Sequence, residues 1–136
     1  MNRKQAREKA FCLIFQLDFH IESLEELIET EKNNIDDLSQ FEYIESTVRG
    51  VWDNLKDIDA LIAKNLKKGW TVLRLSKVML AVMRLAVYEM VYSDSVPANI
   101  AINEALEIVK IYDDPESCAF ANGILGGVYK ETADAK

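Results

Sequence analysis

A short basic cluster at the start of the chain holds the residues best suited to bind a ligand. Arg3, Lys4 and Arg7 fall within two turns of a predicted helix, and Phe15 lies on the same side of that helix as Lys4. Cations beside an aromatic ring are typical of proteins that bind single-stranded RNA, because the cations contact phosphates and the ring stacks on a base. The residues alone leave open the alternative of solvated cations and a core phenylalanine.

A second candidate surface is the predicted junction between two helices near the C-terminus. Tyr112 ends one helix, and Glu116 and Ser117 stand in the first turn of the next. Free backbone N–H groups at a helix start can bind phosphate oxygens. Ordinary helix capping explains the same residues, and the pattern by itself favours capping.

The chain shows no set of residues typical of an enzyme. His20 is the only histidine, and we expect it to cap a helix or to lie on the surface. Cys12 and Cys118 form no CxxC pair, and no group of His, Cys and carboxylate residues has metal-ligand spacing. The glycines near the C-terminus fall inside a helical pattern instead of a phosphate-binding loop. We therefore expect a non-enzyme that holds no metal and no cofactor.

Charge is unevenly distributed along the 136 residues. The formal net charge is −7, so the molecule as a whole should repel nucleic acid, and any RNA contact needs a local basic patch. Basic residues concentrate in the first ten positions and again between residues 60 and 80, whereas residues 21–47 are strongly acidic.

Hydrophobic periodicity predicts an all-α protein of about seven helices. Four of the expected helices cover about 3–19, 39–52, 76–92 and 97–112. An acidic helix follows Ser23 as N-cap, with Glu26 in the capping-box position, and another helix around 58–66 ends at 67–69. The last helix has Asp114 as N-cap and Pro115 at its first position. Short loops between them indicate antiparallel neighbours in one bundle.

The helix expected over residues 76–92 is apolar almost all round, which is typical of a central helix. We expect some polar residues of this helix and the next ones to pair in a buried network that fixes helix register; they are Arg84, Glu89, Asn103, Glu104 and Asn122. Gly123 is expected to permit a close helix approach, because glycine is otherwise unfavourable in a helix.

No targeting or membrane segment stands out. The N-terminus is charged with no apolar run behind it, and the apolar run at 78–83 is too short to span a bilayer. The two unpaired cysteines fit a reducing compartment. We expect one domain over residues 1–136 and a cytoplasmic protein.

An ordered set of short motifs resembles the NusB family of transcription antitermination factors. From residue 70 onward the motifs are Trp70, Arg74-Leu75, the run from Met83 to Glu89, Val96-Pro97, the run from Ala101 to Ala105, and the run from Phe120 to Leu125. The N-terminus adds the run from Arg3 to Glu8, followed by Phe15-Gln16. Only the acidic segment of about 21–47 has no matching motif.

This resemblance implies a fold of two small helical bundles packed together and a function without bond chemistry. Members of the family pair with ribosomal protein NusE, bind boxA RNA and join elongating RNA polymerase with other Nus factors, mainly in ribosomal RNA operons. NusE would supply both a protein interface and positive charge. The resemblance implies RNA contacts at Arg3, Lys4, Arg7, Phe15, Gln16, Tyr112, Glu116 and Ser117, and NusE contacts at Lys64, Lys68, Trp70 and Met79. Gln5 interrupts the arginine-rich start of many relatives, which implies weaker RNA binding by this chain alone.

Two alternatives stay open beside this prediction. A NusB-like domain also precedes some ribosomal RNA cytosine methyltransferases, but that reading needs an α/β cofactor domain after Lys136. A helical adaptor that binds only proteins is the other. The oligomeric state, including a homodimer, is also left open by the sequence.

Overall fold

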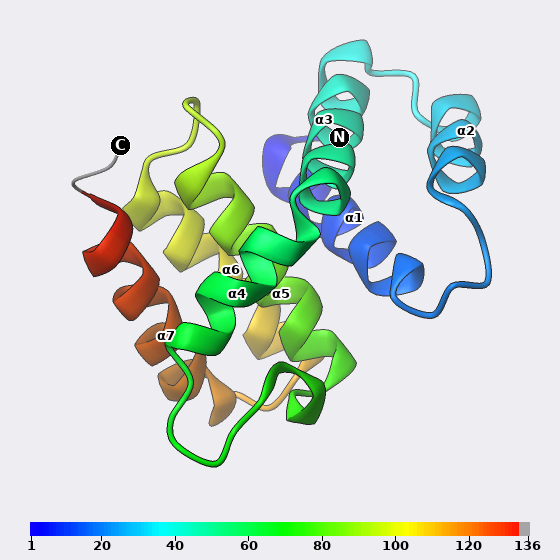
Figure 1. The fold of residues 1–136 in the computed structure, drawn as a ribbon. Coiled ribbons are helices and arrows are strands. Elements are labelled where there is room, and N and C mark those ends of the chain that lie inside the picture. Colours follow the sequence, from blue (N-terminus) through cyan, green and yellow to red (C-terminus); the bar gives the residue numbers. More distant parts are fainter. Residues whose placement is uncertain (134–136) are drawn as a thin grey trace.

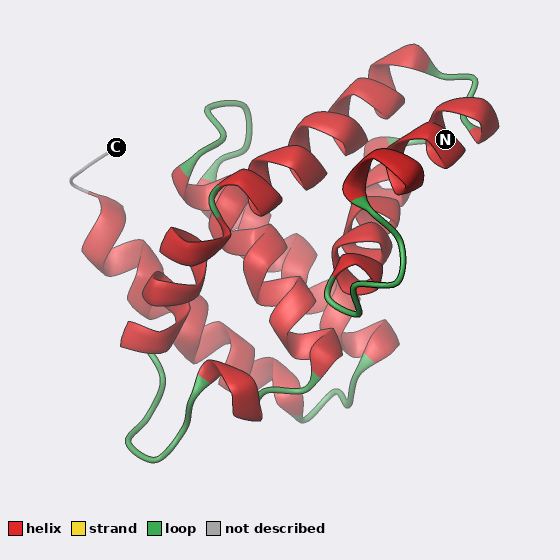
Figure 2. Ribbon diagram, turned by 45° about the vertical axis from the view of Figure 1, so that its right-hand side comes forward, coloured by secondary structure: helices red, strands yellow, loops and turns green. Residues whose placement is uncertain are grey.

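The computed structural model describes residues 1–133, and all the regular structure in this part of the chain is helical (Figure 2). The elements are α1 (Arg3–Leu17), α2 (Leu24–Asn34), α3 (Leu38–Asp53), α4 (Leu55–Lys64), the short 3-10 turn η1 (Val72–Arg74), α5 (Lys77–Val91), α6 (Ala98–Tyr112) and α7 (Ser117–Thr132). The predicted all-α class and the seven α-helices are therefore confirmed. None of the described helices combines the length and apolarity that crossing a bilayer requires.

The helices form two groups that meet at α5 (Figure 1). In the first group α1 packs along α3, and α2 packs against α3 while its Glu31 pairs with Lys9 of α1 (3.5 Å). In the second group α4, α6 and α7 surround α5. Since α5 also contacts α1 and α3, it belongs to the core of both groups.

Helix α5 is central because almost every side chain on it is apolar. Val82, Met83 and Val87 are fully buried, and the polar side chains of Arg84 and Glu89 are buried with them. A helix without a polar face has no solvent side, so it must be enclosed by other helices. This confirms the predicted position of the 76–92 helix.

Several helix ends differ from the expected ones. The capping box of Ser23 and Glu26 is present. Helix α4, however, ends at Lys64 and not at 67–69, because the Asn65 side chain turns back to donate a hydrogen bond to the Leu61 carbonyl. Gly69 does take the left-handed conformation, with φ of 93°, but in the loop beyond the helix.

The other shifted ends have similar local causes. Helix α7 begins at Ser117 and not at Pro115, because the Asp114 side chain accepts from the Glu116 N–H (3.1 Å) and closes a turn ahead of the helix. Pro97 is the N-cap of α6 and not its first residue. Helix α1 stops at Leu17, two residues early, and the chain then turns through a left-handed His20.

The predicted role of Gly123 is wrong, since no atom lies near the position that a side chain would occupy there. Gly50 and Gly127 carry that role. A Cβ atom on Gly50 would overlap the Tyr88 ring, and one on Gly127 would overlap the Asn65 side chain. These two glycines allow α3 to approach α5 and α7 to approach the end of α4.

Candidate nucleic-acid interface

The start of α1 is fixed by a capping box. The Asn2 side chain accepts from the Gln5 N–H (2.8 Å), and the Gln5 side chain accepts from the Asn2 N–H (2.8 Å). Gln5, which interrupts the basic run, therefore sets the point at which the helix begins. No acidic residue stands in the first turn, so the positive end of the helix dipole adds to the charges of Arg3 and Lys4.

Arg3 and Lys4 are exposed, as a phosphate-binding role requires. The Arg3 side chain lies across the start of α3, where its Nε donates to the Gln40 Oε1 atom (2.9 Å). Its guanidinium carbon is 4.2 Å from the centre of the Tyr43 ring. The two helices run side by side in the same direction, so both helix starts lie at this end.

Arg7 does not join these cations, and the expected convergence of three charges is wrong on this point. Its side chain is only 7% exposed and donates to both carboxylate oxygens of Glu89 on α5, at 2.8 and 3.2 Å. The Tyr43 hydroxyl donates to the same carboxylate (3.0 Å). Burial alone would lower the pKa of Arg7, but Glu89 more than offsets it and holds the pKa above its ordinary value.

Phe15 is half-buried, so its ring is partly in the core and partly accessible for the predicted stacking on a base. Its ring packs on Phe11 (6.4 Å between centroids) and edge-on to Phe19 (5.0 Å). Gln16 is exposed beside it. Phe19 is 46% exposed and extends the aromatic row, and it was not among the predicted contact residues.

The end of α6 packs against α1 and joins the two candidate RNA segments. The Tyr112 ring lies 4.9 Å from the Phe11 ring, and its hydroxyl donates to the Glu8 carboxylate. That carboxylate, together with burial, raises the pKa of the Tyr112 hydroxyl. Tyr112 remains 40% exposed, so its ring is part of the surface next to Glu8.

The α6–α7 junction offers fewer free donors than expected. The Glu116 N–H is bonded to the Asp114 carboxylate, and the Ser117 N–H donates to the Asp114 carbonyl (2.8 Å). The Ser117 hydroxyl lies within 3.5 Å of the Asp113 carboxylate. These bonds occupy the Glu116 and Ser117 N–H groups in the turn ahead of the helix, and the Glu116 side chain is exposed.

The predicted NusE segment borders this junction. A shallow hollow is lined by Trp70, Arg74, Leu75, Ser76, Met79, Asp113, Asp114, Glu116, Ser117 and Phe120. The Trp70 and Phe120 rings are 5.5 Å apart, and the Arg74 guanidinium stands 5.1 Å from the Trp70 ring. Arg74 and Phe120 were part of the recognised motifs but were not predicted as contact residues.

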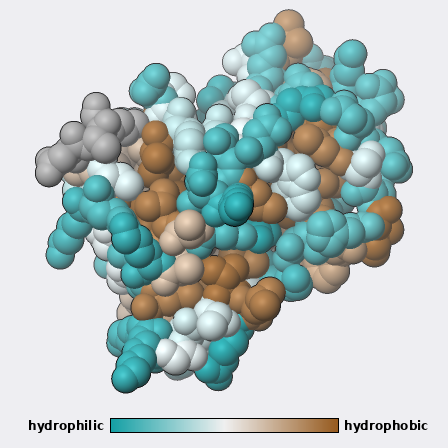
Figure 3. Space-filling view, in the orientation of Figure 1, coloured by the Kyte–Doolittle hydropathy of each residue, from teal (hydrophilic) through white to brown (hydrophobic). Residues whose placement is uncertain are grey.

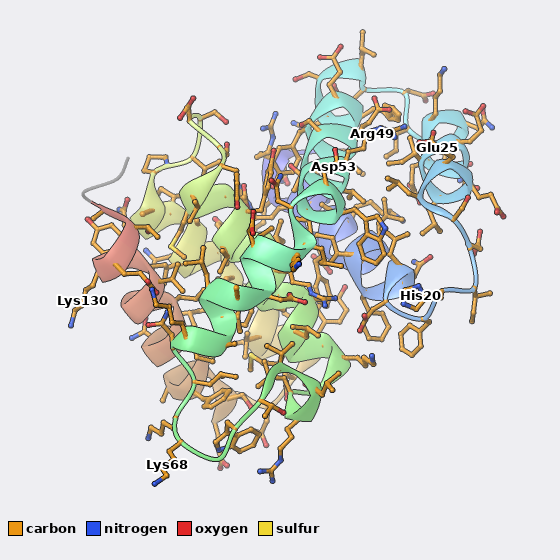
Figure 4. All side chains as sticks on the ribbon, viewed as in Figure 1. His20, Glu25, Arg49, Asp53, Lys68 and Lys130 are labelled. Carbon is orange, nitrogen blue, oxygen red and sulfur yellow. The ribbon has the colours of Figure 1, made fainter. Side chains whose placement is uncertain are left out.

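The four predicted NusE-contact residues differ in accessibility. Trp70 is 43% exposed, and Lys68 projects into solvent from the loop between α4 and α5 (Figure 4). Lys64 is exposed but paired with Glu131 (2.8 Å). Met79 is buried and forms the floor of the hollow. In the space-filling view an apolar patch lies just above this loop (Figure 3).

The expected buried polar network exists, but with fewer members. Arg84 binds both oxygens of Asp59 (2.9 and 2.8 Å) and also Asp18 (3.2 Å). Asn103 and Asn122 are exposed instead. In the described residues no group of three His, Cys, Asp or Glu side chains could hold a metal ion.

Comparisons with known proteins agree with the sequence motifs. The model of the NusB family matches residues 4–130. The chain is 46% identical over 131 residues to the transcription antitermination protein NusB of Acetivibrio thermocellus, covering 96% of this chain and 90% of the relative. The corresponding protein of Listeria monocytogenes serotype 4a is 44% identical, with 96% and 98% covered.

Solved structures give the same family. T. maritima NusB superposes with a TM-score of 0.85 at 36% identity, covering 96% of this chain and 92% of that one. A chain in the crystal structure of the antitermination factors NusB and NusE in complex with dsRNA also gives 0.85, at 30% identity, with 95% and 96% covered.

Proposed function

The chain belongs to the NusB family, and on that premise we propose that it is a transcription antitermination factor. It binds boxA RNA together with ribosomal protein NusE and joins elongating RNA polymerase, mainly in ribosomal RNA operons. One observation carries the RNA part of this proposal. The Tyr112 ring at the end of α6 rests on Phe11 of α1, so the two candidate RNA segments form one surface.

The proposed RNA surface runs from the start of α1 to the end of α6. Arg3 and Lys4 contact phosphates, and the half-exposed rings of Phe15 and Tyr112 offer places for bases to stack. Gln16, exposed beside Phe15, offers hydrogen bonds to a base edge. Glu116 and Ser117 border this surface. Arg7 contributes through the fold, since its charge is held by Glu89.

NusE is proposed to bind next to this surface, at the hollow around Trp70. The hollow includes Glu116 and Ser117 from the α6–α7 junction. NusE bound there would therefore lie directly beside the RNA. Trp70 and Lys68 are the accessible contacts, and the buried Met79 lines the same hollow as Trp70. A NusE protein on this face would bring positive charge to a chain whose net charge is −7.

The mechanism is recognition and tethering. The known members of the family named above are antitermination proteins, and we propose that no bond chemistry takes place. The relatives are matched over 90% and 98% of their own lengths, which favours this function over that of a methyltransferase RNA-binding domain.

The decisive experiment is a titration of fluorescently labelled boxA RNA, followed by anisotropy at fixed salt, with and without NusE. We expect weak binding by this protein alone and much tighter binding once NusE is present. A scrambled RNA of equal length controls for nonspecific attraction. Equal affinity with and without NusE contradicts the cooperative model, and no RNA binding in either case favours the adaptor that binds only proteins.

A further inference from the structure

We infer that Gln40 and Tyr43, both on α3, are positioning residues that hold the Arg3 guanidinium ready for an RNA phosphate. The inference rests on the proposed RNA-binding function. It assigns a role in RNA binding to the first half of α3, a segment without any of the NusB-family motifs. The acidic segment of about 21–47 would then contribute to RNA binding indirectly, because Gln40 and Tyr43 orient Arg3.

The geometry around Arg3 leaves its outer edge free. Its Nε donates to Gln40, and the Tyr43 ring lies 4.2 Å beneath the guanidinium carbon. Within the described residues the two Nη groups have no hydrogen-bond partner. An arginine in water explores many rotamers, so fixing one of them removes an entropy cost that binding must otherwise meet.

Gln40 and Tyr43 are themselves held in place. The Gln40 N–H is capped by the Asp37 carboxylate at 3.3 Å, which fixes the first turn of α3. Tyr43 is only 9% exposed, and its hydroxyl donates to the buried Glu89 carboxylate. The Tyr43 ring under Arg3 is therefore connected to the ion pair of Arg7 and Glu89 in the core.

The start of α1 adds positive potential at this position. Arg3 occupies the first residue of α1, and no acidic residue stands in the first turn of that helix. The start of α3 lies alongside, but the Asp37 carboxylate caps its backbone and offsets the dipole of α3. The net contribution of the helix dipoles therefore comes from α1.

A double-mutant cycle tests whether Gln40 acts through Arg3. Affinity for labelled boxA RNA with NusE, its salt dependence and the melting temperature are measured for the parent, Gln40→Ala, Arg3→Ala and the double variant. We expect Gln40→Ala to weaken binding roughly two- to tenfold, the range of one net hydrogen bond, with no change in melting temperature. In the Arg3→Ala background the same change should cost nothing. Ser39→Ala, exposed on the same turn, is the control.

The outcomes separate this inference from the function it rests on. If the parent does not bind the RNA, the proposed function fails and the inference fails with it. If the parent binds but Gln40→Ala loses nothing, or loses equally in both backgrounds, the positioning role is overturned while RNA binding stands. Arg3→Lys adds a further check, because lysine keeps the charge but cannot donate from an Nε beside a planar group. Affinity equal to the parent would show that charge alone is enough.

The Tyr43 ring and its hydroxyl can be tested apart. Tyr43→Phe keeps the ring under Arg3 and removes the hydroxyl bonded to Glu89, so we expect a lower melting temperature and a smaller loss of affinity than in Tyr43→Leu. Tyr43→Leu removes the ring as well and should also weaken binding roughly two- to fivefold, as expected for an exposed cation–π contact. Equal affinities of the two variants, measured well below their melting temperatures, would overturn the role of the ring.

Discussion

The two ends of α1 are both joined to α5 by ion pairs, but with opposite signs and different access to water. Near its start, Arg7 of α1 binds Glu89 of α5. Just past its end, Asp18 accepts from Arg84 of α5, which also binds Asp59 of α4. Because the two helices are antiparallel, the pairs fix both ends of the contact between the two helix groups.

The pair near the start of α1 is almost dry, whereas the other is partly wet. The exposed fractions of Arg7 and Glu89 side chains are 7% and 1%. Asp18 and Asp59 are 13% and 26% exposed, and Lys77, which also pairs with Asp18, is 52% exposed. Buried charges are costly to separate and poorly screened, while a partly wet network tolerates the loss of one member.

The difference shows that neighbouring basic residues in one short run have different roles. Arg3 and Arg7 are one helical turn apart, yet one faces solvent and the other holds the core. The dry pair is connected to Arg3 through Tyr43, so the start of the proposed RNA surface is joined to the more buried of the two contacts. At the other end of α1 the wet pair follows the turn that carries Phe15 and Gln16, so this part of the proposed RNA surface borders the more hydrated contact.

The largest expected effect comes from breaking the dry pair. Glu89→Ala leaves the Arg7 guanidinium buried without a counter-charge and should lower the free energy of unfolding by about 3–5 kcal/mol in urea titrations. The triple change Arg7→Met, Glu89→Leu and Tyr43→Phe removes every member and should recover most of that loss. If the triple variant is no more stable than Glu89→Ala, burial of an unpaired charge is not the cause.

The matching change at the wet end should cost less. Asp59→Ala removes the bidentate partner of Arg84 but leaves Asp18 and nearby water, so we expect a loss of about 1.5–3 kcal/mol in the same titration. Asp53→Ala, on the exposed surface of α3 (Figure 4), is the control and should change little. A loss equal to that of Glu89→Ala would erase the contrast between the two ends.

Lowering the pH should reduce the stability contributed by the wet pair, because Asp18 becomes protonated. Burial alone would raise the pKa of Asp18, but Lys77 and Arg84 more than offset it and hold the pKa below its ordinary value. A carboxylate with a lowered pKa stabilises the fold above its unfolded pKa, about 3.9, and loses that contribution as the pH falls through the folded value. The stability difference between the parent and Asp18→Asn should therefore shrink below about pH 4. A difference that is constant from pH 7 to pH 3 would contradict this assignment.

The smallest effect on stability is expected at Arg3 and Lys4, where the effect on RNA binding is large. Removing both with alanine should change the free energy of unfolding by about 0.5 kcal/mol or less, because neither is buried. The slope of log affinity for boxA RNA against log salt should flatten by ~0.7 for each lost phosphate contact. Lys32→Ala with Lys56→Ala, two exposed cations elsewhere, is the control. Unchanged binding by the Arg3 and Lys4 variant would move the RNA site, most directly to the α6–α7 junction.

The helices could be read from the sequence because their signals are local. Apolar spacing located all seven, and the Ser23 and Glu26 pair marked the start of α2. Helix ends were less accurate wherever one polar side chain reached back to the backbone, as Asn65 does at α4 and Asp114 does before α7. The competition between such a bond and another helical turn depends on packing that a single sequence does not display.

The candidate site was harder to read because its contacts are distant in sequence. Nothing near Arg7 distinguishes it from Arg3. Glu89, which decides its role, is 82 residues away, and Gln40, which orients Arg3, is 37 residues away. The motifs did identify Arg84 and Glu89 as buried polar residues, because charges on an apolar helix need partners. Their partners had to come from the fold.

The separation of Arg7 from Glu89 also bears on how the chain is made. The ribosome produces α1, α2 and α3 before it reaches α5. Glu89 is 82 residues after Arg7, and synthesis at about 5–20 residues per second takes about 4 to 16 s to reach it. Throughout that interval Arg7 lacks its partner Glu89, so its charge in the nascent first group is not yet paired. The group that begins the chain is thus completed by a helix from the second group, and the RNA surface can mature only after α5 has emerged.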